Sequence, residues 1–330
     1  MPDTPHASHV PTMALADAVA ALARGELVAF PTETVYGLGA NARNPNAIAR
    51  LYAAKGRPSA HPVIVHIANV GALADWVQEI PPAAQRLAAA CWPGPLTLVL
   101  KRAPHVLDAV TGGQDTVAMR CPDHPLALAL LEACAAAGIP GLVAPSANRF
   151  GHVSPTTAAH VREEFGPEIA GVLEGGACAV GIESTIVDVS TGTPRVLRPG
   201  MITEAQIAAL LGGSLGAVDA PAPRVSGALA SHYAPRTPVR LVALDALAAH
   251  TADGTIAVLA FPSSLSGLAE RAGLARKAAP ESAADYAREL YANLRELDAL
   301  GCALIVVERP PSTEAWRGIN DRLQRAAAAH

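Results

Sequence analysis

The chain has 330 residues, of which 51% are hydrophobic, 16% charged and 4% aromatic, and its formal net charge is −4. This length can form one large domain or two ordinary ones with well-filled cores. The slightly negative charge excludes a protein that attracts nucleic acid through a global basic field, and no apolar run reaches the roughly 20 residues of a membrane-spanning helix.

The five cysteines are scattered and follow neither a C-x-x-C pattern nor a His/Cys metal spacing. Reduced thiols in a cytosolic protein are therefore the expected state. Residues 1–12 are polar and contain proline and histidine, unlike a secretory signal. We predict a cytoplasmic protein that does not contact a membrane.

Helix and strand patterns alternate along residues 13–211, which predicts an α/β domain with a mixed sheet. Asn44 followed by Pro45 is a typical helix start, and this helix would deliver Lys55 and Arg57 at its C-terminal end. Thr203 and Gln206 form a capping-box pattern. In chain order we expect helix Met13–Arg24, strand Leu27–Phe30, helix Asn44–Ala54, strand Pro62–Ala68, helix Pro82–Cys91, strands Leu96–Lys101 and Thr116–Arg120, helix Pro125–Ala137, strands Gly141–Ala144, Ser184–Val189 and Arg195–Arg198, and helix Thr203–Leu211.

A second unit follows a segment with the composition of a linker. Residues 212–223 are rich in Gly, Ser, Ala and Pro. The pattern then restarts with strands Val239–Ala243 and Thr255–Ala260, helix Ser282–Leu300, strand Ala303–Val307 and helix Thr313–Ala327. We therefore divide the chain into a domain at 1–212, a linker at 213–235 and a small three-layer α/β domain at 236–330.

Two short polar signatures stand out, Lys55-Gly56-Arg57-Pro58 and Ser146-Ala147-Asn148. Each follows an apolar stretch, where side chains at the ends of strands and helices face clefts. Two cations beside a hydroxyl and an amide suit a phosphate-bearing ligand. The chain has no P-loop, no G-x-G-x-x-G and no G-x-S-x-G elbow, so a bound nucleotide would use another loop set.

Each candidate taken alone also has a purely structural explanation. Lys55 and Arg57 fit a solvated helix end that balances the helix dipole. Residues 30–39 fit a strand followed by a turn. His66 fits an ordinary histidine within a sheet, and Arg120 fits a strand end at the surface.

Together, five motifs in order resemble the Sua5/YrdC/YciO family over roughly residues 13–235, and the appended unit resembles the two-domain branch of that family. The lysine-arginine and serine-asparagine pairs resemble the members with synthase activity. The motifs are P-T-E-T-V-Y-G-L from Pro31, K-G-R-P-x-x-x-P from Lys55, W-P-G-P-L-T from Trp92, R-x-P-x-H-P from Arg120 and A-P-S-A-N from Ala144.

The resemblance implies a YrdC-like twisted mixed sheet with a positively charged cavity, a linker, and a small C-terminal Rossmann-like α/β domain. It also implies that L-threonine, bicarbonate and ATP become L-threonylcarbamoyl-AMP and pyrophosphate, for modification of adenosine 37 in tRNA. Mg²⁺ would accompany ATP, held mainly by phosphates and water, with no dedicated protein metal site. A tRNA or a threonylcarbamoyl transferase is a further possible partner.

Residue roles are carried over from the family in the same way. The linker tyrosine would reach ATP, and Ser231 to Pro235 would form a lid over the product. The expected catalytic residues are Lys55, Arg57, Ser146 and Asn148; the expected ATP contacts are Arg57, His61, Thr116, Ala144, Ser146, Ser154, Arg198 and Tyr233; the expected L-threonine contacts are Thr34, His66, Arg120 and Ser184.

Two other functions remain open. A double-stranded RNA-binding factor could use the same basic cavity, although the near-neutral charge weighs against it. A carbamoyl-transfer maturation module would be expected to carry acylphosphatase-like and zinc-finger segments, and this sequence has neither.

Overall fold

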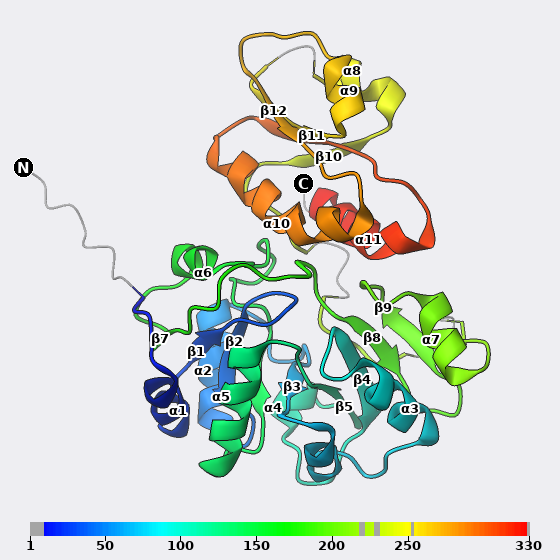
Figure 1. Ribbon diagram of the computed structural model, residues 1–330. Helices are drawn as coiled ribbons and strands as arrows, with labels where there is room; N and C mark the ends of the chain where they lie inside the picture. Colours follow the sequence, from blue (N-terminus) through cyan, green and yellow to red (C-terminus); the bar gives the residue numbers. More distant parts are fainter. Residues whose placement is uncertain (1–9, 218–221, 228–231, 252–253, 329–330) are drawn as a thin grey trace, which may run out of the picture.

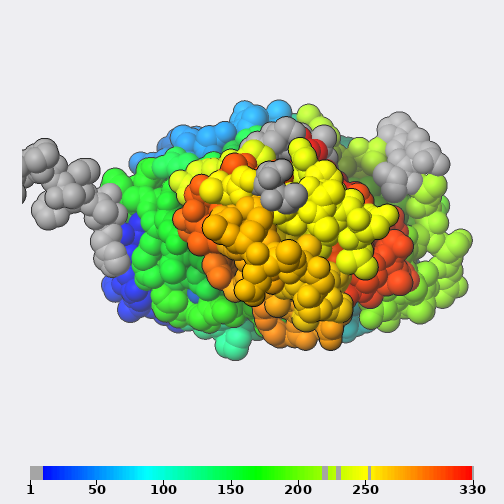
Figure 2. Space-filling model, turned by 90° about the horizontal axis from the view of Figure 1, so that it is seen from above, coloured from blue at the N-terminus to red at the C-terminus, as the bar shows by residue number. Residues whose placement is uncertain are grey.

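The computed structural model describes residues 10–217, 222–227, 232–251 and 254–328. They form two α/β domains, and the C-terminal domain lies over one side of the larger N-terminal domain (Figure 1). Viewed from above, the yellow-to-red residues of the C-terminal domain cover much of the blue-to-green domain beneath (Figure 2). The predicted α/β class is therefore confirmed.

The larger domain is built on a mixed nine-stranded sheet with the order β7-β1-β2-β6-β3-β5-β4-β8-β9. Its central strands are buried because helices and loops cover both faces. The strands are β1 (Val28–Phe30), β2 (Gly37–Asn41), β3 (Ile64–His66), β4 (Leu96–Lys101), β5 (Thr116–Arg120), β6 (Leu142–Val143), β7 (Gly171–Val172), β8 (Thr185–Asp188) and β9 (Arg195–Arg198).

Helix caps encoded in the sequence fix where the helices of this domain begin. The Asn44 side chain accepts from the backbone N–H groups of Asn46 and Ala47, and Thr203 and Gln206 form the predicted capping box. The helices are α1 (Leu15–Ala23), α2 (Pro45–Lys55), α3 (Pro82–Cys91), α4 (Asp108–Thr111), α5 (Pro125–Ala136), α6 (Ala158–Glu164), α7 (Glu204–Leu211) and the 3₁₀ helix η1 (Val70–Asp75).

The C-terminal domain is a three-layer unit around a four-stranded parallel sheet, as predicted. The strands are β10 (Val239–Val242), β11 (Ile256–Ala260), β12 (Leu274–Ala278) and β13 (Leu304–Glu308), in the order β10-β13-β11-β12. Helices α10 (Ala283–Ala299) and α11 (Arg317–Ala327) lie on the face toward the larger domain, and α8 (Leu247–His250) and α9 (Pro262–Ser266) lie on the other (Figure 1). The 3₁₀ helices are η2 (Leu244–Ala246) and η3 (Glu314–Trp316).

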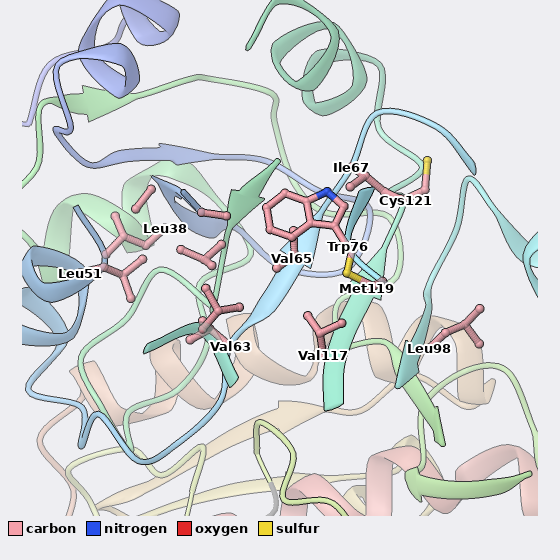
Figure 3. Packing of buried hydrophobic residues seen from close by; sticks show 14 of the residues in the cluster. Leu38, Leu51, Val63, Val65, Ile67, Trp76, Leu98, Val117, Met119 and Cys121 are labelled. Atoms are coloured by element: carbon pink, nitrogen blue, oxygen red, sulfur yellow. The ribbon is translucent and has the colours of Figure 1, made fainter. Parts of the chain in front are cut away.

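The main core fills the space between the nine-stranded sheet and its helices. Leu38, Val65 and Met119 come from three different strands and belong to the same buried cluster as Trp76, which follows η1 (Figure 3). All four side chains are at most 1% exposed. This burial holds the strand ends, where the candidate residues lie, in fixed positions.

Strand register brings the motifs together. An isolated bridge pairs Gly37 with Ser146, so the P-T-E-T-V-Y-G-L and A-P-S-A-N motifs lie side by side. A Cβ on Gly39 would lie 3.0 Å from a ring carbon of Phe30 and from the Val28 carbonyl oxygen, so this strand needs glycine. The parallel pairing of β3 with β5 sets His66 opposite Arg120.

Several elements were not predicted from the sequence, and three of them show the reason. Strand β2 has the sequence GLGAN, whose two glycines have low strand propensity, and α6 is short and rich in charged residues. Strand β12, with the sequence LARKA, lies at an edge and is only partly buried. Each forms because a neighbouring element packs beside it, a contact that local patterns do not encode.

The segment between α7 and β10 contains no helix or strand among its described residues. The predicted linker 213–235 falls in this segment, although 218–221 and 228–231 lie outside the described residues. No helix in the described ranges combines the length and apolarity needed to cross a bilayer.

Candidate functional site

Lys55 is the last residue of α2, and its side chain turns inward rather than into solvent. Gly56 caps the helix in the left-handed conformation, with φ 61°. The Lys55 side chain is 2% exposed, and its Nζ donates to the carbonyl oxygens of Ser146, at 2.6 Å, and Asn148. These bonds join the two sequence signatures, and the solvated-helix-end explanation of Lys55 is wrong.

The turn at Ser146–Asn148 presents polar groups that the protein itself leaves unused. The Asn148 amide donates to the carbonyl oxygens of Arg149, at 2.7 Å, and His152, at 3.0 Å. Its Oδ1 atom is buried without a hydrogen-bond partner among the described residues. Ser146 is half-buried. A ligand with donor groups would satisfy this turn.

Two arginines lie near Lys55 and meet at the linker. Arg57 donates through Nη2 to the Pro62 carbonyl oxygen, at 2.9 Å, and to Ser226 Oγ, at 3.4 Å. Arg198, at the end of β9, donates to the carbonyl oxygen of Ser226 at 2.9 Å and to both oxygens of Ser184. Ser226 therefore sits between the two guanidinium groups.

These three cations have no carboxylate partner at ion-pair distance within the described residues. Burial lowers the pKa of Lys55 well below its usual 10.5, and it also lowers the pKa values of Arg57 and Arg198. Their partners are neutral carbonyl and hydroxyl oxygens, and the buried Arg57 Nε has none among the described residues. Such an arrangement favours an anionic ligand.

A second cluster surrounds Arg120, which is buried and not at the surface. Its Nη2 lies 2.7 Å from Glu33 Oε2, although the N–H is not aligned for a hydrogen bond. His66 lies beside it on β3, and burial together with the Arg120 charge lowers the His66 pKa to about 3. Thr34 follows Glu33 and is fully buried. The fork of Arg120 suits a small carboxylate.

Ser184 lies beside Arg198, one of the three buried cations. Its hydroxyl lies 2.7 Å from Thr97 Oγ1, and its oxygen atoms accept from Arg198. The preceding residue, Glu183, binds the hydroxyl of Ser154 at 2.6 Å. The structure therefore places the ATP candidates Ser154 and Arg198 beside the L-threonine candidate Ser184.

The remaining ATP candidates come from the loop after Arg57 and from two central strands. His61 and Arg57 both contact the Phe150 ring, with centroid separations of 5.6 and 5.7 Å respectively. Thr116 is buried at the start of β5. Ala144 follows β6, and its N–H donates to the Ile64 carbonyl oxygen at 3.0 Å.

The linker covers this face of the sheet. Val225 packs on Ile64 and Val99, and the remaining cavity, which Thr116 and Ser226 help to line, measures about 10 Å³. Further along, Tyr233 is 1% exposed and has φ 63°, a left-handed conformation that is rare for an aromatic residue. Ser231 of the predicted lid lies outside the described residues.

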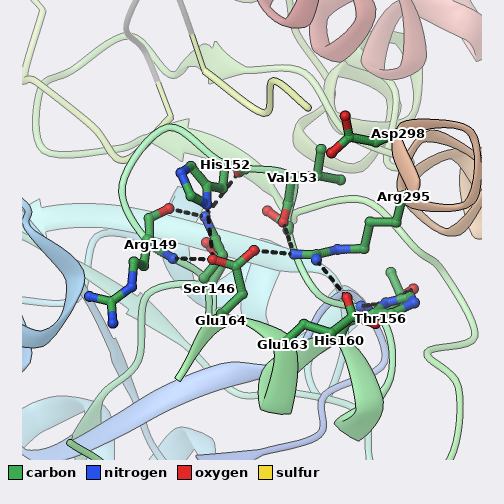
Figure 4. Close-up of polar contacts among 12 residues, drawn as sticks. Ser146, Arg149, His152, Val153, Thr156, His160, Glu163, Glu164, Arg295 and Asp298 are labelled. Carbon is green, nitrogen blue, oxygen red and sulfur yellow. Dashed lines mark hydrogen bonds and ion pairs between the residues drawn. The ribbon is translucent and has the colours of Figure 1, made fainter. Parts of the chain in front are cut away.

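A larger cavity of about 710 Å³ opens between the two domains. At its wall Arg295 of α10 donates to Glu164 of α6 at 2.7 Å and to the Val153 carbonyl oxygen at 2.5 Å (Figure 4). Glu164 also accepts from the backbone N–H of Arg149 and lies 3.0 Å from His152 Nδ1. These contacts tie α10 to the loop that follows Asn148.

Sequence reasoning missed several polar residues that touch the candidates. Glu33 stands inside the P-T-E-T motif, and Glu183 directly precedes Ser184. An acidic residue next to a candidate residue is therefore the sequence signal that could have identified both. Ser226 lies in the linker, where no local sequence pattern distinguishes it. Tyr291 and Arg322 lie on amphipathic helices, where nothing in the local pattern separates them from other residues.

Comparison with known proteins supplies the family. A family model described as Telomere recombination (Sua5_yciO_yrdC) matches residues 20–200, more than half of the chain. The chain belongs to the Sua5/YrdC/YciO family. A second model, described as threonylcarbamoyl-AMP synthase, C-terminal domain, matches residues 202–328.

Curated relatives and a solved structure agree with this assignment. Threonylcarbamoyl-AMP synthase from Bacillus subtilis is 47% identical, with 69% of this chain and 66% of that protein aligned. The protein of that name from Pyrococcus abyssi is 45% identical, with 66% and 64% aligned. The chain thus aligns to slightly less than two thirds of these relatives.

The fold of the whole chain has a solved counterpart. The crystal structure of P. abyssi Sua5 complexed with L-threonine superposes with a TM-score of 0.86 at 34% identity, covering 96% of this chain and 94% of that one. The two-domain family architecture expected from the motifs is therefore confirmed.

Proposed function

We propose that the chain is an L-threonylcarbamoyl-AMP synthase, which converts L-threonine, bicarbonate and ATP into threonylcarbamoyl-AMP and pyrophosphate. One observation carries the proposal: Lys55, Arg57 and Arg198 are buried together and have only neutral partners within the described residues. Burying such charges costs several kcal/mol, an amount that a bound triphosphate offsets. The names of the curated relatives and the L-threonine bound to P. abyssi Sua5 support this choice.

The reaction needs no enzyme nucleophile. The threonine amine attacks the carbon of bicarbonate or CO₂ to form a carbamate, with loss of water in the case of bicarbonate. A carbamate oxygen then attacks the α-phosphorus of ATP, and pyrophosphate leaves with the electrons of the broken P–O bond. Positioning and charge stabilisation are the contributions that a protein makes to such a transfer.

Each cluster has a role in this scheme. Lys55, Arg57 and Arg198 neutralise phosphate and carbamate oxygens, the Ser146 hydroxyl donates to them, and Asn148 Oδ1 accepts from a donor group of the bound substrates. In the second cluster, Arg120 binds the threonine carboxylate, and Thr34, His66 and Ser184 surround the rest of the amino acid. The further ATP contacts in this scheme are His61, Thr116, Ala144, Ser154 and Tyr233.

Mg²⁺ would enter with ATP, bound by phosphate oxygens and water. The buried carboxylates Glu33 and Glu183 each lie within 2.8 Å of an arginine nitrogen, so neither is free to bind a cation. The ion would spread the triphosphate charge as the pyrophosphate leaves. The product would pass to a threonylcarbamoyl transferase acting on tRNA, and a cytoplasmic location fits the five free cysteines.

The deciding experiment is pyrophosphate release from ATP and Mg²⁺, measured with and without L-threonine and bicarbonate. Release should need both co-substrates and fall about 10- to 100-fold in Lys55→Ala and Ser146→Ala, since each removes polar contacts to charged oxygens. Lys277→Ala is the matched control, because this lysine pairs with Glu296 near the surface of the C-terminal domain.

Two results would contradict the proposal. Pyrophosphate release that is absent under all conditions would exclude the synthase. Tight, salt-dependent binding of double-stranded RNA would then favour the RNA-binding alternative, which the burial of all three cations disfavours.

A further inference from the structure

Glu183 lies at the contact between the two domains, and both of its carboxylate oxygens are bonded. The Ser154 hydroxyl donates to Oε1 at 2.6 Å. Oε2 accepts from the Tyr291 hydroxyl at 2.9 Å and from Arg322 Nε at 2.8 Å. The Glu183 residue is 7% exposed, so this carboxylate is anchored from two domains at once.

The two cross-domain donors are themselves immobilised. Arg322, on α11, is 1% exposed and also donates to the carbonyl oxygen of Pro199 at 2.9 Å. Its guanidinium carbon lies 5.4 Å from the centre of the Tyr233 ring, which in turn stacks on Tyr291 of α10 at 5.8 Å. Both donors are therefore held in place by packing as well as by hydrogen bonds.

The backbones of the two domains approach each other closely at two glycines. A Cβ on Gly181 would lie 2.4 Å from the Ala287 carbonyl oxygen of α10, and one on Gly318 of α11 would lie 3.0 Å from the Gly200 carbonyl oxygen. A Cβ at position 181 has no space without a shift of the backbone, and one at position 318 would be tightly crowded. The glycine at 181 stands two residues before Glu183, so backbone packing fixes the donors and the acceptor together.

Glu183 also lies close to a cation that the proposed reaction needs. Burial alone would raise the Glu183 pKa, but the charges of Arg322 and Arg198 outweigh burial and hold it at about 2. Arg198 donates to Ser184, the next residue, and not to the Glu183 carboxylate. The Glu183 carboxylate is thus paired with Arg322, while Arg198 keeps neutral partners.

We propose that Tyr291 and Arg322 are positioning residues, through which the C-terminal domain holds the Glu183 carboxylate away from Arg198 and fixes the Ser154 hydroxyl for ATP. This inference rests on the proposed function, in which Arg198 and Ser154 contact ATP. Without Arg322, the Glu183 charge pairs with Arg198 and neutralises it, so the triphosphate loses a cation. The C-terminal domain thereby completes a site whose ligand contacts lie in the other domain and the linker.

Tyr291→Phe and Tyr286→Phe make a matched pair on helix α10. Both rings are buried, but the Tyr286 hydroxyl has no hydrogen-bond partner among the described residues. Tyr291→Phe should raise the KM for ATP about tenfold, whereas Tyr286→Phe should leave it unchanged. The melting temperatures of the two variants should be similar, because each keeps its ring.

Arg322→Met provides the charge test. It should raise the KM for ATP by about tenfold or more, and adding Glu183→Gln should recover part of that loss, since no carboxylate remains to attract Arg198. A residue that only supports the fold would not show this rescue. If Arg322→Met fails to fold, the tyrosine pair still decides the question.

The dissociation constant of ATP, measured by titration calorimetry on the same full-length variants, separates the two proposals. Wild-type protein that binds ATP but releases no pyrophosphate with both co-substrates would exclude the synthase alone. Tyr291→Phe with wild-type ATP affinity and KM, or an Arg322→Met defect that Glu183→Gln leaves unchanged, would overturn the positioning role. Equal effects of the two tyrosine variants would also overturn it.

Discussion

The contact between Arg295 and Glu164 gives a stability prediction that does not depend on the chemistry. Arg295 of α10, in the C-terminal domain, forms an ion pair with Glu164 of α6 (Figure 4). Burial alone would raise the pKa of Glu164, but the groups around it, from His152 to Arg295, lower it from 4.5 to about 2. Arg295→Met keeps the aliphatic stem and removes one of these groups.

The size of the effect follows from that pKa. The fall in the Glu164 pKa from 4.5 to about 2 corresponds to at most about 3.4 kcal/mol from all of its partners together. Solvent screening reduces this free energy, and part of it comes from His152 and the Arg149 N–H rather than from Arg295. We therefore expect Arg295→Met to lower the free energy of unfolding by about 1–2 kcal/mol at pH 7.

The sign of the pH dependence is fixed by the direction of the shift. The folded pKa lies below the unfolded one, so the stabilisation is complete above about pH 4.5 and is lost as the pH falls toward 2. The difference between wild type and Arg295→Met should therefore shrink on acidification.

Urea denaturation followed by tryptophan fluorescence measures the free energy of unfolding of both proteins. Trp316 reports on the C-terminal domain, and Trp76 and Trp92 report on the larger one. Arg288→Met is the control, because its ion pair with Asp285 on the same helix is half exposed and should contribute little to stability. An Arg295→Met effect no larger than the control, or one that stays constant between pH 7 and about pH 3.5, would refute the reasoning.

Three further predictions concern the proposed ligands and the domain contact. Arg120→Lys should raise the KM for L-threonine about tenfold with little change for ATP, because lysine lacks the bidentate fork; an equal rise for both substrates in steady-state kinetics would contradict this role. Tyr233→Ala should shorten the lifetime of threonylcarbamoyl-AMP, followed by chromatography during turnover, if the buried ring acts as the proposed lid; an unchanged lifetime would exclude the lid. Gly181→Ala should lower the melting temperature more than Gly176→Ala, because both have positive φ but only Gly181 faces the α10 backbone; equal shifts in calorimetry would argue against the close contact.

Much of the fold was predictable because its signals are local. The cap at Asn44 with Pro45, and the capping box at Thr203, fix helix starts within a few residues. Apolar runs such as residues 256–260 predicted buried strands. The lysine-arginine and serine-asparagine signatures could be found for the same reason, since each is a short run of polar residues after an apolar element.

The sequence by itself determined the alternation of elements, the two-domain family and the group of candidate residues. Only the tertiary structure decided that Lys55 turns inward to the Ser146 turn, that Glu33 faces Arg120, and that Arg322 meets Glu183 across 139 positions of sequence. The reason is physical: burial and pairing of a charge depend on which distant groups share its low-dielectric surroundings. A helix pattern shows which face is apolar, but only packing shows which buried cation has a carboxylate partner and which has neutral partners alone among the described residues.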